Sequence, residues 1–101
     1  MEKCCCNNKS YRHRDREKRE LDDLNKRLNR ISGQLNGIKK MLDDNRYCGD
    51  ILIQISAAKK GLEKVAEIIL KTHMKTCVHD ELIKGDEEII DETIELMERL
   101  K

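Results

Sequence analysis

The sequence predicts an all-α protein whose helices pack as a small bundle. The chain of 101 residues contains no proline, tryptophan or phenylalanine and only two tyrosines. It is rich in leucine, isoleucine, glutamate and lysine, and 41% of its residues are charged. A composition without helix breakers or large aromatic side chains is typical of helices. Apolar residues also recur at spacings of three and four, which is the period of an amphipathic helix.

The first predicted helix begins at about Arg16. Its apolar side consists of Leu21, Leu24, Leu28, Ile31, Leu35, Ile38, Met41 and Leu42. Residues 1–15 lack this periodicity and are predicted to be a disordered tail, which carries three adjacent cysteines. The segment Asp43-Asp44-Asn45 interrupts the helical pattern and predicts a turn.

The second predicted helix runs from near Tyr47 to about Cys77. Its buried side consists of Ile51, Ile55, Ala58, Leu62, Val65, Ile69 and Leu70. Gly85 then interrupts the pattern, and the acidic residues 86–88 are favourable charges for a new helix N-terminus. The last helix extends to about Leu100. Its apolar stripe consists of Ile90, Ile94 and Met97.

Together these elements predict a single helical domain over residues 16–101. It is a three-helix protomer, in which a long antiparallel hairpin precedes a short C-terminal helix. A lone protomer with so little bulky apolar mass would be weakly stable, so oligomerisation is expected. The apolar stripe that the hairpin leaves exposed indicates where a partner packs.

Charge and cysteine content narrow the classes of function. Residues 1–48 carry 13 Lys/Arg against 8 Asp/Glu, whereas residues 49–101 carry 8 against 12, which is a weak argument for an anionic partner. No apolar stretch approaches the ~20 residues that span a membrane, and the start lacks a signal-peptide core. Five cysteines, three of them adjacent, make a poor disulfide framework. They fit reduced thiols in a cytoplasmic protein that has no membrane partner.

Cys48, His73 and Cys77 form the strongest candidate site. His73 and Cys77 are four residues apart, so on a helix they share one face and can hold one ion. Cys48 lies 25 residues before His73, which is roughly 37 Å along a continuous helix. The three side chains can therefore close on one metal only if two chains pack antiparallel. A ligand set divided in this way suits a sensor, because occupancy changes how the subunits are arranged.

Two thiolates and one imidazole are soft donors, which select Cu(I), Zn(II) and related ions. Three ligands in a plane suit Cu(I), whereas structural zinc requires a fourth ligand. His79 or the N-terminal cysteines are candidates for that ligand, so Zn(II) binding in vitro stays open. The alternative without a metal also stays open, because a buried cysteine commonly acts as a small apolar residue.

Several motifs resemble the copper-sensitive operon repressor family. They are Tyr47-Cys48, His73-x3-Cys77, RLNRISGQLNGI from Arg27 to Ile38, and DILIQISA from Asp50 to Ala57. The resemblance extends from about Lys26 to Glu95. It implies an all-helical DNA-binding repressor, in which dimers pair into a tetramer and Cu(I) binds across the dimer interface.

The resemblance also implies roles for individual residues. Cys48, His73 and Cys77 would be the Cu(I) ligands, and Tyr47 and Glu92 would connect the metal-bound imidazole to the last helix. A metal-bound histidine is usually oriented through the N–H that does not face the metal. Related nickel/cobalt sensors have histidine at the position of Cys77, and persulfide sensors lack the histidine. The set found here therefore favours copper.

For DNA binding, no helix-turn-helix, zinc finger or aromatic-studded basic patch is visible. Arg27 and Lys64 resemble the basic residues with which the family contacts DNA, and Lys26 and Arg30 extend that patch on the first helix. The chain departs from the family pattern at Ser32 and Asn36, where glutamate and arginine are frequent. Cys4, Cys5 and Cys6 are a further departure and are candidate accessory thiols.

These observations give a leading hypothesis of a Cu(I)-responsive transcriptional repressor, released from operator DNA by the metal. Its partners would be operator DNA, other copies of the chain and, as a candidate, a copper chaperone. One alternative is a thiol redox or persulfide sensor with the same fold, and another is a metal-storage or metal-transfer protein. An enzyme is not expected, since no general base accompanies a nucleophile outside the Cys/His cluster.

Overall fold

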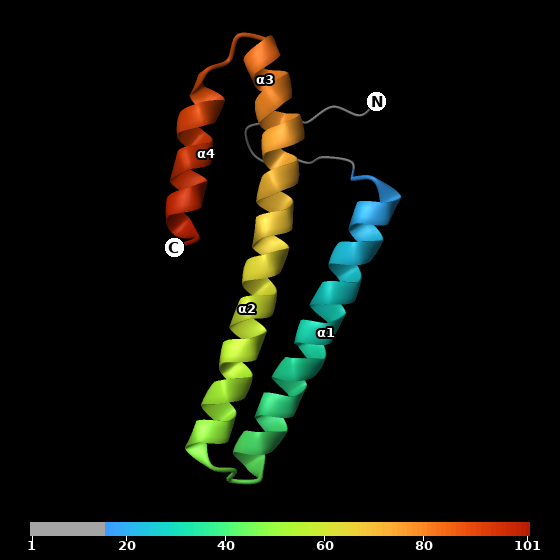
Figure 1. The fold of residues 1–101 in the computed structure, drawn as a ribbon, viewed down its shortest axis with the longest axis vertical. Helices are drawn as coiled ribbons and strands as arrows, with labels where there is room; N and C mark the ends of the chain where they lie inside the picture. Colours follow the sequence, from blue (N-terminus) through green and yellow to red (C-terminus); the bar gives the residue numbers. More distant parts are fainter. Residues whose placement is uncertain (1–15) are drawn as a thin grey trace. The chain divides into compact units, whose positions relative to one another are not determined.

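The computed structural model describes residues 16–101, and every element in that range is helical (Figure 1). The helices are α1 (Lys18–Asp43), α2 (Cys48–His73), the π-helical turn η1 (Met74–Val78), α3 (His79–Ile83) and α4 (Glu88–Arg99). The predicted all-α class is therefore confirmed. The predicted tail, with Cys4, Cys5 and Cys6, lies outside the described residues.

Within the described residues the chain forms two compact units, residues 17–67 and residues 68–101. The boundary falls inside α2, so this helix contributes to both units.

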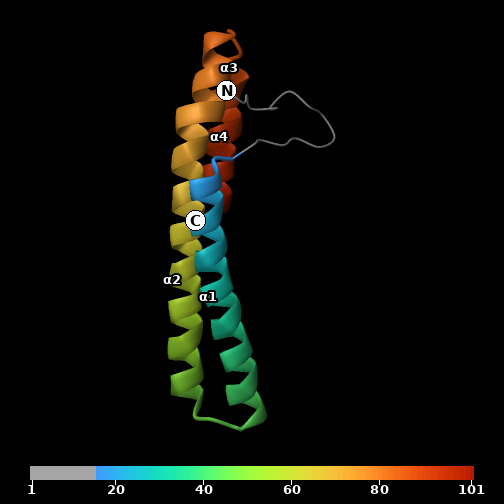
Figure 2. The same cartoon turned by 90° about the vertical axis from the view of Figure 1, so that its right-hand side faces the viewer.

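The first unit is an antiparallel hairpin of α1 and the beginning of α2, which lie side by side in both views (Figures 1 and 2). α1 ends in the turn that the sequence predicts. The amide of Asp44 donates to the carbonyl of Lys40 at 2.9 Å, and Asn45 then adopts a positive φ of 56°. Asparagine tolerates this left-handed conformation better than most residues, so the turn reverses the chain at little cost.

The core of the hairpin is a stripe in which every seventh residue is buried. The buried residues are Leu24, Ile31 and Ile38 on α1, and Ile51, Ala58 and Val65 on α2. Gly61 permits close approach of the two helices, since a Cβ there would lie 3.1 Å from the Ile31 side chain. A second set of apolar residues remains exposed beside the buried stripe. These residues are Leu21, Leu28, Leu35 and Leu42 on α1, and Ile55 and Leu62 on α2.

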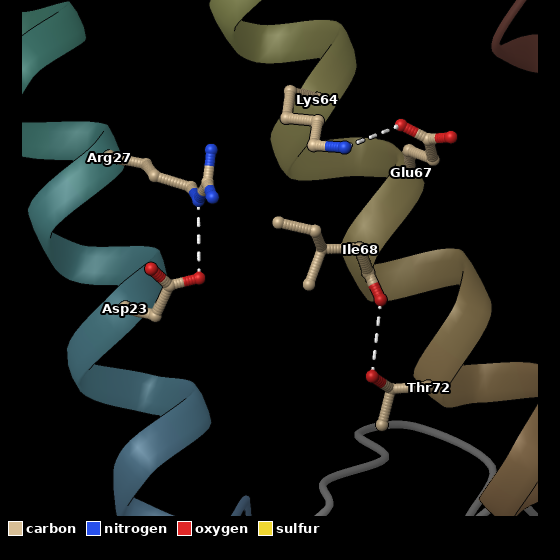
Figure 3. A network of polar contacts seen from close by, with 6 residues as sticks. All are labelled: Asp23, Arg27, Lys64, Glu67, Ile68 and Thr72. Atoms are coloured by element: carbon tan, nitrogen blue, oxygen red, sulfur yellow. Dashed lines mark hydrogen bonds and ion pairs between the residues drawn. The ribbon is translucent and has the colours of Figure 1, made fainter.

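In the second unit the α-helical conformation of α2 ends earlier than the sequence predicts. The α-helical hydrogen-bonding pattern of α2 stops at His73 rather than continuing to Cys77, and η1 follows. A π-helical turn contains one residue more than an α-helical turn, and such turns are frequent at functional sites. The hydroxyl of Thr76 donates to the carbonyl of Thr72 at 2.7 Å, and Thr72 donates in the same way to Ile68 (Figure 3). Side-chain bonds of this kind often accompany bends in helices.

Both α3 and α4 contact η1, and together they form the core of this unit. Its centre consists of Cys77, Val78 and Ile89. Gly85 turns the chain with a φ of 93°, as its position in the sequence predicts. Glu81 is buried here, and although its Oε2 atom makes no hydrogen bond, that atom lies 3.5 Å from the Nζ of Lys84.

Candidate metal centre

Cys48 is the first residue of α2 and carries an exposed, free thiol. The ring of Tyr47 beside it is 74% exposed and lies over Gly49. A Cβ at position 49 would lie 2.5 Å from the Cε2 of Tyr47, which is too close for any side chain. The glycine therefore permits the position that the tyrosine ring adopts.

His73 is the last residue of α2, and its side chain is connected to α4. The Nε2 of His73 and the Oγ1 of Thr93 form a hydrogen bond of 3.0 Å. Thr93 is only 3% exposed, so this bond is sheltered from competing water. A histidine that binds a metal is commonly oriented by a hydrogen bond of this kind, made through the ring nitrogen that does not face the metal.

Cys77 lies in η1 and is 5% exposed. The hydroxyl of Thr76 lies 3.9 Å from its sulfur. This sulfur is disulfide-bonded in the structure. Since the thiolate is the form that binds metals, Cys77 must be reduced before it can serve as a ligand.

The structure places His73 and Cys77 in one unit, whereas Cys48 begins the same helix that His73 ends. Cys48 and His73 thus belong to different units. Accordingly, within residues 16–101 of one protomer no three His, Cys, Asp or Glu side chains form a metal-binding group. The donors nevertheless fit a thiophilic ion, because both predicted sulfur ligands and the imidazole are soft.

Other predicted site residues have different surroundings. Glu92 is half-buried and adjacent to Thr93 on α4. Thr93, which the sequence did not single out, connects His73 to α4 through a hydrogen bond to its Nε2. His79, the candidate fourth zinc ligand, is exposed, and its Nδ1 lies 3.6 Å from the Oδ1 of Asp80.

The predicted DNA-contacting residues lie on the hairpin. Arg27 on α1 bonds through Nε to the Oδ2 of Asp23 at 3.1 Å, and Lys64 on α2 lies 3.4 Å from the Oε1 of Glu67 (Figure 3). Lys26 and Arg30 are exposed on α1. The four cations are thus accessible, and two of them are engaged by a carboxylate of their own helix.

Every element of residues 16–101 is helical, with candidate soft donors at both ends of one helix and accessible cations on a hairpin. These are features of a metal-dependent regulator. Residues 20–99 match the family model of the metal-sensitive transcriptional repressor, so the chain belongs to this family of DNA-binding regulators. No helix in residues 16–101 is long and apolar enough to cross a membrane.

Similar proteins include several copper sensors. The chain is 40% identical over 82 residues to the copper-sensing transcriptional repressor CsoR of Bacillus subtilis, which covers 80% of this chain and 81% of the relative. Identity to the copper-sensing repressor RicR of Mycobacterium tuberculosis is 39% over 66 residues, covering 65% and 69% of the two chains.

Two solved structures are similar to this fold. The crystal structure of the copper-sensing repressor CsoR with Cu(I) from Geobacillus thermodenitrificans has a TM-score of 0.80 and 40% identity. It covers 84% of this chain and 90% of that one. The nickel-responsive regulator InrS has a TM-score of 0.69 and 36% identity, covering 80% of this chain and 92% of that one.

Replacement of Thr93 by valine tests the bond to His73. The variant keeps the volume but leaves the imidazole without this partner, so we expect a loss of about 1–2 kcal/mol in the free energy of unfolding of the metal-free protein. Chemical denaturation measures this loss. Thr93→Ser, which keeps the hydroxyl, serves as the control and should recover most of the stability. Equal stability of the valine variant and the wild type would show that the bond is unimportant.

Replacement of Gly49 by alanine tests whether the position of the Tyr47 ring affects metal binding independently of the stability of α2. Alanine in a helix is favoured over glycine by about 0.5–1 kcal/mol, yet its Cβ must displace the Tyr47 ring. We expect altered tyrosine fluorescence and weaker Cu(I) binding in a chelator competition, without loss of thermal stability. Gly37→Ala is the matched control, because a Cβ there meets nothing within 4 Å. If both variants bind Cu(I) like the wild type, the position of Tyr47 does not matter.

Proposed function

We propose that this protein is a Cu(I)-responsive transcriptional repressor that binds operator DNA in its metal-free form. The observation that carries the proposal is the placement of Cys48 at one end of α2 and of His73 and Cys77 at and beyond the other. Such a donor set is incomplete in one protomer and complete in an antiparallel pair. Cys48 of one protomer, together with His73 and Cys77 of the other, would hold Cu(I) through soft donors, and the shared ion would link the two protomers.

The exposed apolar residues of the hairpin support a homodimer. Leu21, Leu28 and Leu35 repeat every seven residues on α1, and Ile55 and Leu62 have the same spacing on α2. Such residues at coiled-coil spacing need a partner to remove them from water. A second hairpin packed antiparallel would cover this stripe. It would also bring Cys48 of each protomer near His73 and Cys77 of its partner, so that two equivalent sites form.

Changes at the site would reach the rest of the protomer through α4. His73 is hydrogen-bonded to Thr93, and α4 also contacts the turn that carries Cys77. If His73 and Cys77 reorient toward a shared metal, α4 must move with them. Tyr47 is adjacent to Cys48 in sequence, and Glu92 is adjacent to Thr93. We assign to these residues the coupling of metal binding to the quaternary arrangement.

The DNA-binding surface in this proposal consists of Arg27, Lys64, Lys26 and Arg30, repeated in a tetramer of two dimers. Repetition multiplies a modest basic patch, because contacts to phosphates supply most of the affinity. Metal binding favours an arrangement in which the repeated patches no longer match the duplex. By linkage, metal and DNA weaken each other's binding equally, typically by about 1–3 kcal/mol. The protein acts in the cytoplasm, where its operator is, and is a repressor rather than an enzyme.

One observation favours a second candidate function. Cys77 is disulfide-bonded in this structure, and a cysteine that can be oxidised is what a thiol redox or persulfide sensor requires. A His73→Ala variant discriminates the two functions. A redox sensor should still release DNA upon oxidation of its thiols, whereas a copper sensor should lose its response to Cu(I).

The decisive experiment is an anaerobic titration of the reduced protein with Cu(I). X-ray absorption reports the ligands, and a labelled fragment of the protein's own promoter reports DNA release. We expect one copper per protomer, bound by two sulfurs and one nitrogen, with DNA released at that stoichiometry. Copper bound by sulfur alone, with DNA unaffected, would contradict the proposal and would favour metal storage at the accessory thiols Cys4, Cys5 and Cys6. Titration with Zn(II) in parallel measures the selectivity.

A further inference from the structure

We propose that Asp23 and Glu67 limit the affinity for operator DNA by engaging Arg27 and Lys64 in ion pairs that phosphates must displace. This inference rests on the proposed function, in which these two cations contact DNA. It assigns a role to two acidic residues that the proposed function leaves unused.

The two ion pairs have the same construction. On α1, Asp23 accepts a bond of 3.1 Å from the Nε of Arg27 four residues later. On α2, Glu67 lies 3.4 Å from the Nζ of Lys64 three residues earlier. The four side chains are between 34% and 63% exposed, so the carboxylates reach solvent together with the cations. Figure 3 shows each cation next to the acid of its own helix.

The two pairs lie at the same level of the hairpin. Gly61 on α2 packs against Ile31 on α1. Arg27 lies one turn before Ile31 on α1. Because α2 runs antiparallel, one turn after Gly61 reaches the same level, which is next to Lys64. The two pairs therefore form one surface that contains two cations and two anions.

This surface lies away from the exposed apolar residues. Arg27 and Leu28 are three and four residues after the buried Leu24, so they lie on opposite sides of the buried stripe. The same argument applies to Lys64 and Leu62, which flank the buried Val65 on opposite sides. A partner that covers the apolar side thus leaves both ion pairs accessible to a duplex.

The carboxylates oppose DNA binding in two ways. A phosphate that approaches Arg27 or Lys64 must replace an existing partner, and the displaced carboxylate then remains close to the negative duplex. Exposed ion pairs are weak, so the replacement is possible. The residual repulsion is nevertheless repeated in every protomer that contacts the operator. Together these effects keep the binding loose enough for a metal signal to release it.

The test compares Asp23→Asn and Glu67→Gln with two acids that have no partner in the basic patch. Asp22→Asn removes the same charge from a residue that lies 3.9 Å from Lys18 instead. Glu63→Gln removes the same charge next to Lys64 along α2, where Glu63 is exposed. The net charge changes equally in every variant, so a general electrostatic effect would be the same in all four.

Binding of the reduced, metal-free full chain to its own promoter fragment is measured by fluorescence anisotropy at several salt concentrations. We expect Asp23→Asn and Glu67→Gln to raise the affinity by about threefold to tenfold each, and the two controls by less than about twofold. In an Arg27→Ala background, Asp23→Asn should have no more effect than the controls. Equal effects of all four variants, or weaker binding by Asp23→Asn and Glu67→Gln, would overturn the inference.

The Arg27→Ala variant alone separates this inference from the function on which it rests. If it binds DNA as tightly as the wild type, Arg27 does not contact the operator, and the proposed DNA-binding surface fails together with the inference. If it binds weakly while Asp23→Asn leaves the affinity unchanged, only the role of Asp23 is refuted. Release by Cu(I) should persist in Asp23→Asn and Glu67→Gln, because neither acid is near the donors in sequence.

Discussion

A Cys48→Ala variant is expected to bind operator DNA as the wild type does and to retain it when Cu(I) is added. The thiol is exposed at the start of α2, so its removal disturbs no core and leaves the fold intact. The remaining donors, His73 and Cys77, lie in one protomer and cannot link it to the next. Loss of residues that merely orient a ligand costs 10–100-fold in metal affinity, so loss of a ligand should weaken Cu(I) binding by more than about 100-fold.

Anisotropy of a labelled promoter fragment during an anaerobic Cu(I) titration gives the DNA affinity and the Cu(I) concentration at which DNA is released. A chelator sets the concentration of free Cu(I). The matched control replaces Cys4, Cys5 and Cys6 together by alanine, and this variant should release DNA as the wild type does. Normal release by Cys48→Ala would refute the divided metal site. Failure of the control instead would show that the accessory thiols take part in sensing.

Arg27→Ala is expected to have the second-largest effect, on DNA affinity rather than on the metal response. Each protomer on the operator then binds one phosphate fewer, so the effect multiplies with the number of protomers. We expect the affinity to fall by at least about tenfold, and the slope of log affinity against log salt to decrease by about one for each phosphate that is no longer bound. The variant should remain folded, because Arg27 is outside the buried stripe.

Arg99→Ala is a suitable control for Arg27→Ala, since it removes the same charge from the last turn of α4. It should leave the salt dependence of DNA binding unchanged. Lys64→Ala should behave like Arg27→Ala, because both residues belong to the same proposed surface. If Arg27→Ala and Arg99→Ala weaken binding equally, the effect is one of net charge, and a specific interaction of Arg27 with the operator is excluded.

The sequence predicts the hairpin because its signals are local, but it does not predict which apolar residues one protomer buries. Ile55 and Leu62, expected on the buried side of the second helix, are exposed. The repeat of Leu24, Ile31 and Ile38 defines the buried side of α1, and the turn at Asn45 is visible as a break in that repeat. The end of α2 is not predicted, because a π-helical turn differs from an α-helical one by a single residue and has no signature in composition. The candidate donors Cys48, His73 and Cys77 stay a prediction that rests on residue type, spacing and family resemblance.

Contacts of the donors depend on tertiary structure and are harder to predict. Thr93 meets His73 across 20 residues of sequence, and nothing in the sequence distinguishes its hydroxyl from that of any other threonine. The acidic Glu92 next to it is the more conspicuous residue in sequence. By contrast, the pair of Asp23 and Arg27 has a spacing of four on one helix and could have been predicted from sequence.

The π-helical turn η1 also bears on how the protein could have diversified. The seven-residue repeat of Ile51, Ala58 and Val65 extrapolates to His79, which is exposed, whereas Cys77 and Glu81 are buried instead. Such a shift of phase is what the extra residue of a π-helical turn produces. A deletion of one residue between His73 and Cys77 would restore a regular helix and rotate Cys77 out of register with its partner donor. Short insertions and deletions at this turn, rather than substitutions, would therefore be a simple evolutionary route to a new ligand set on an unchanged scaffold.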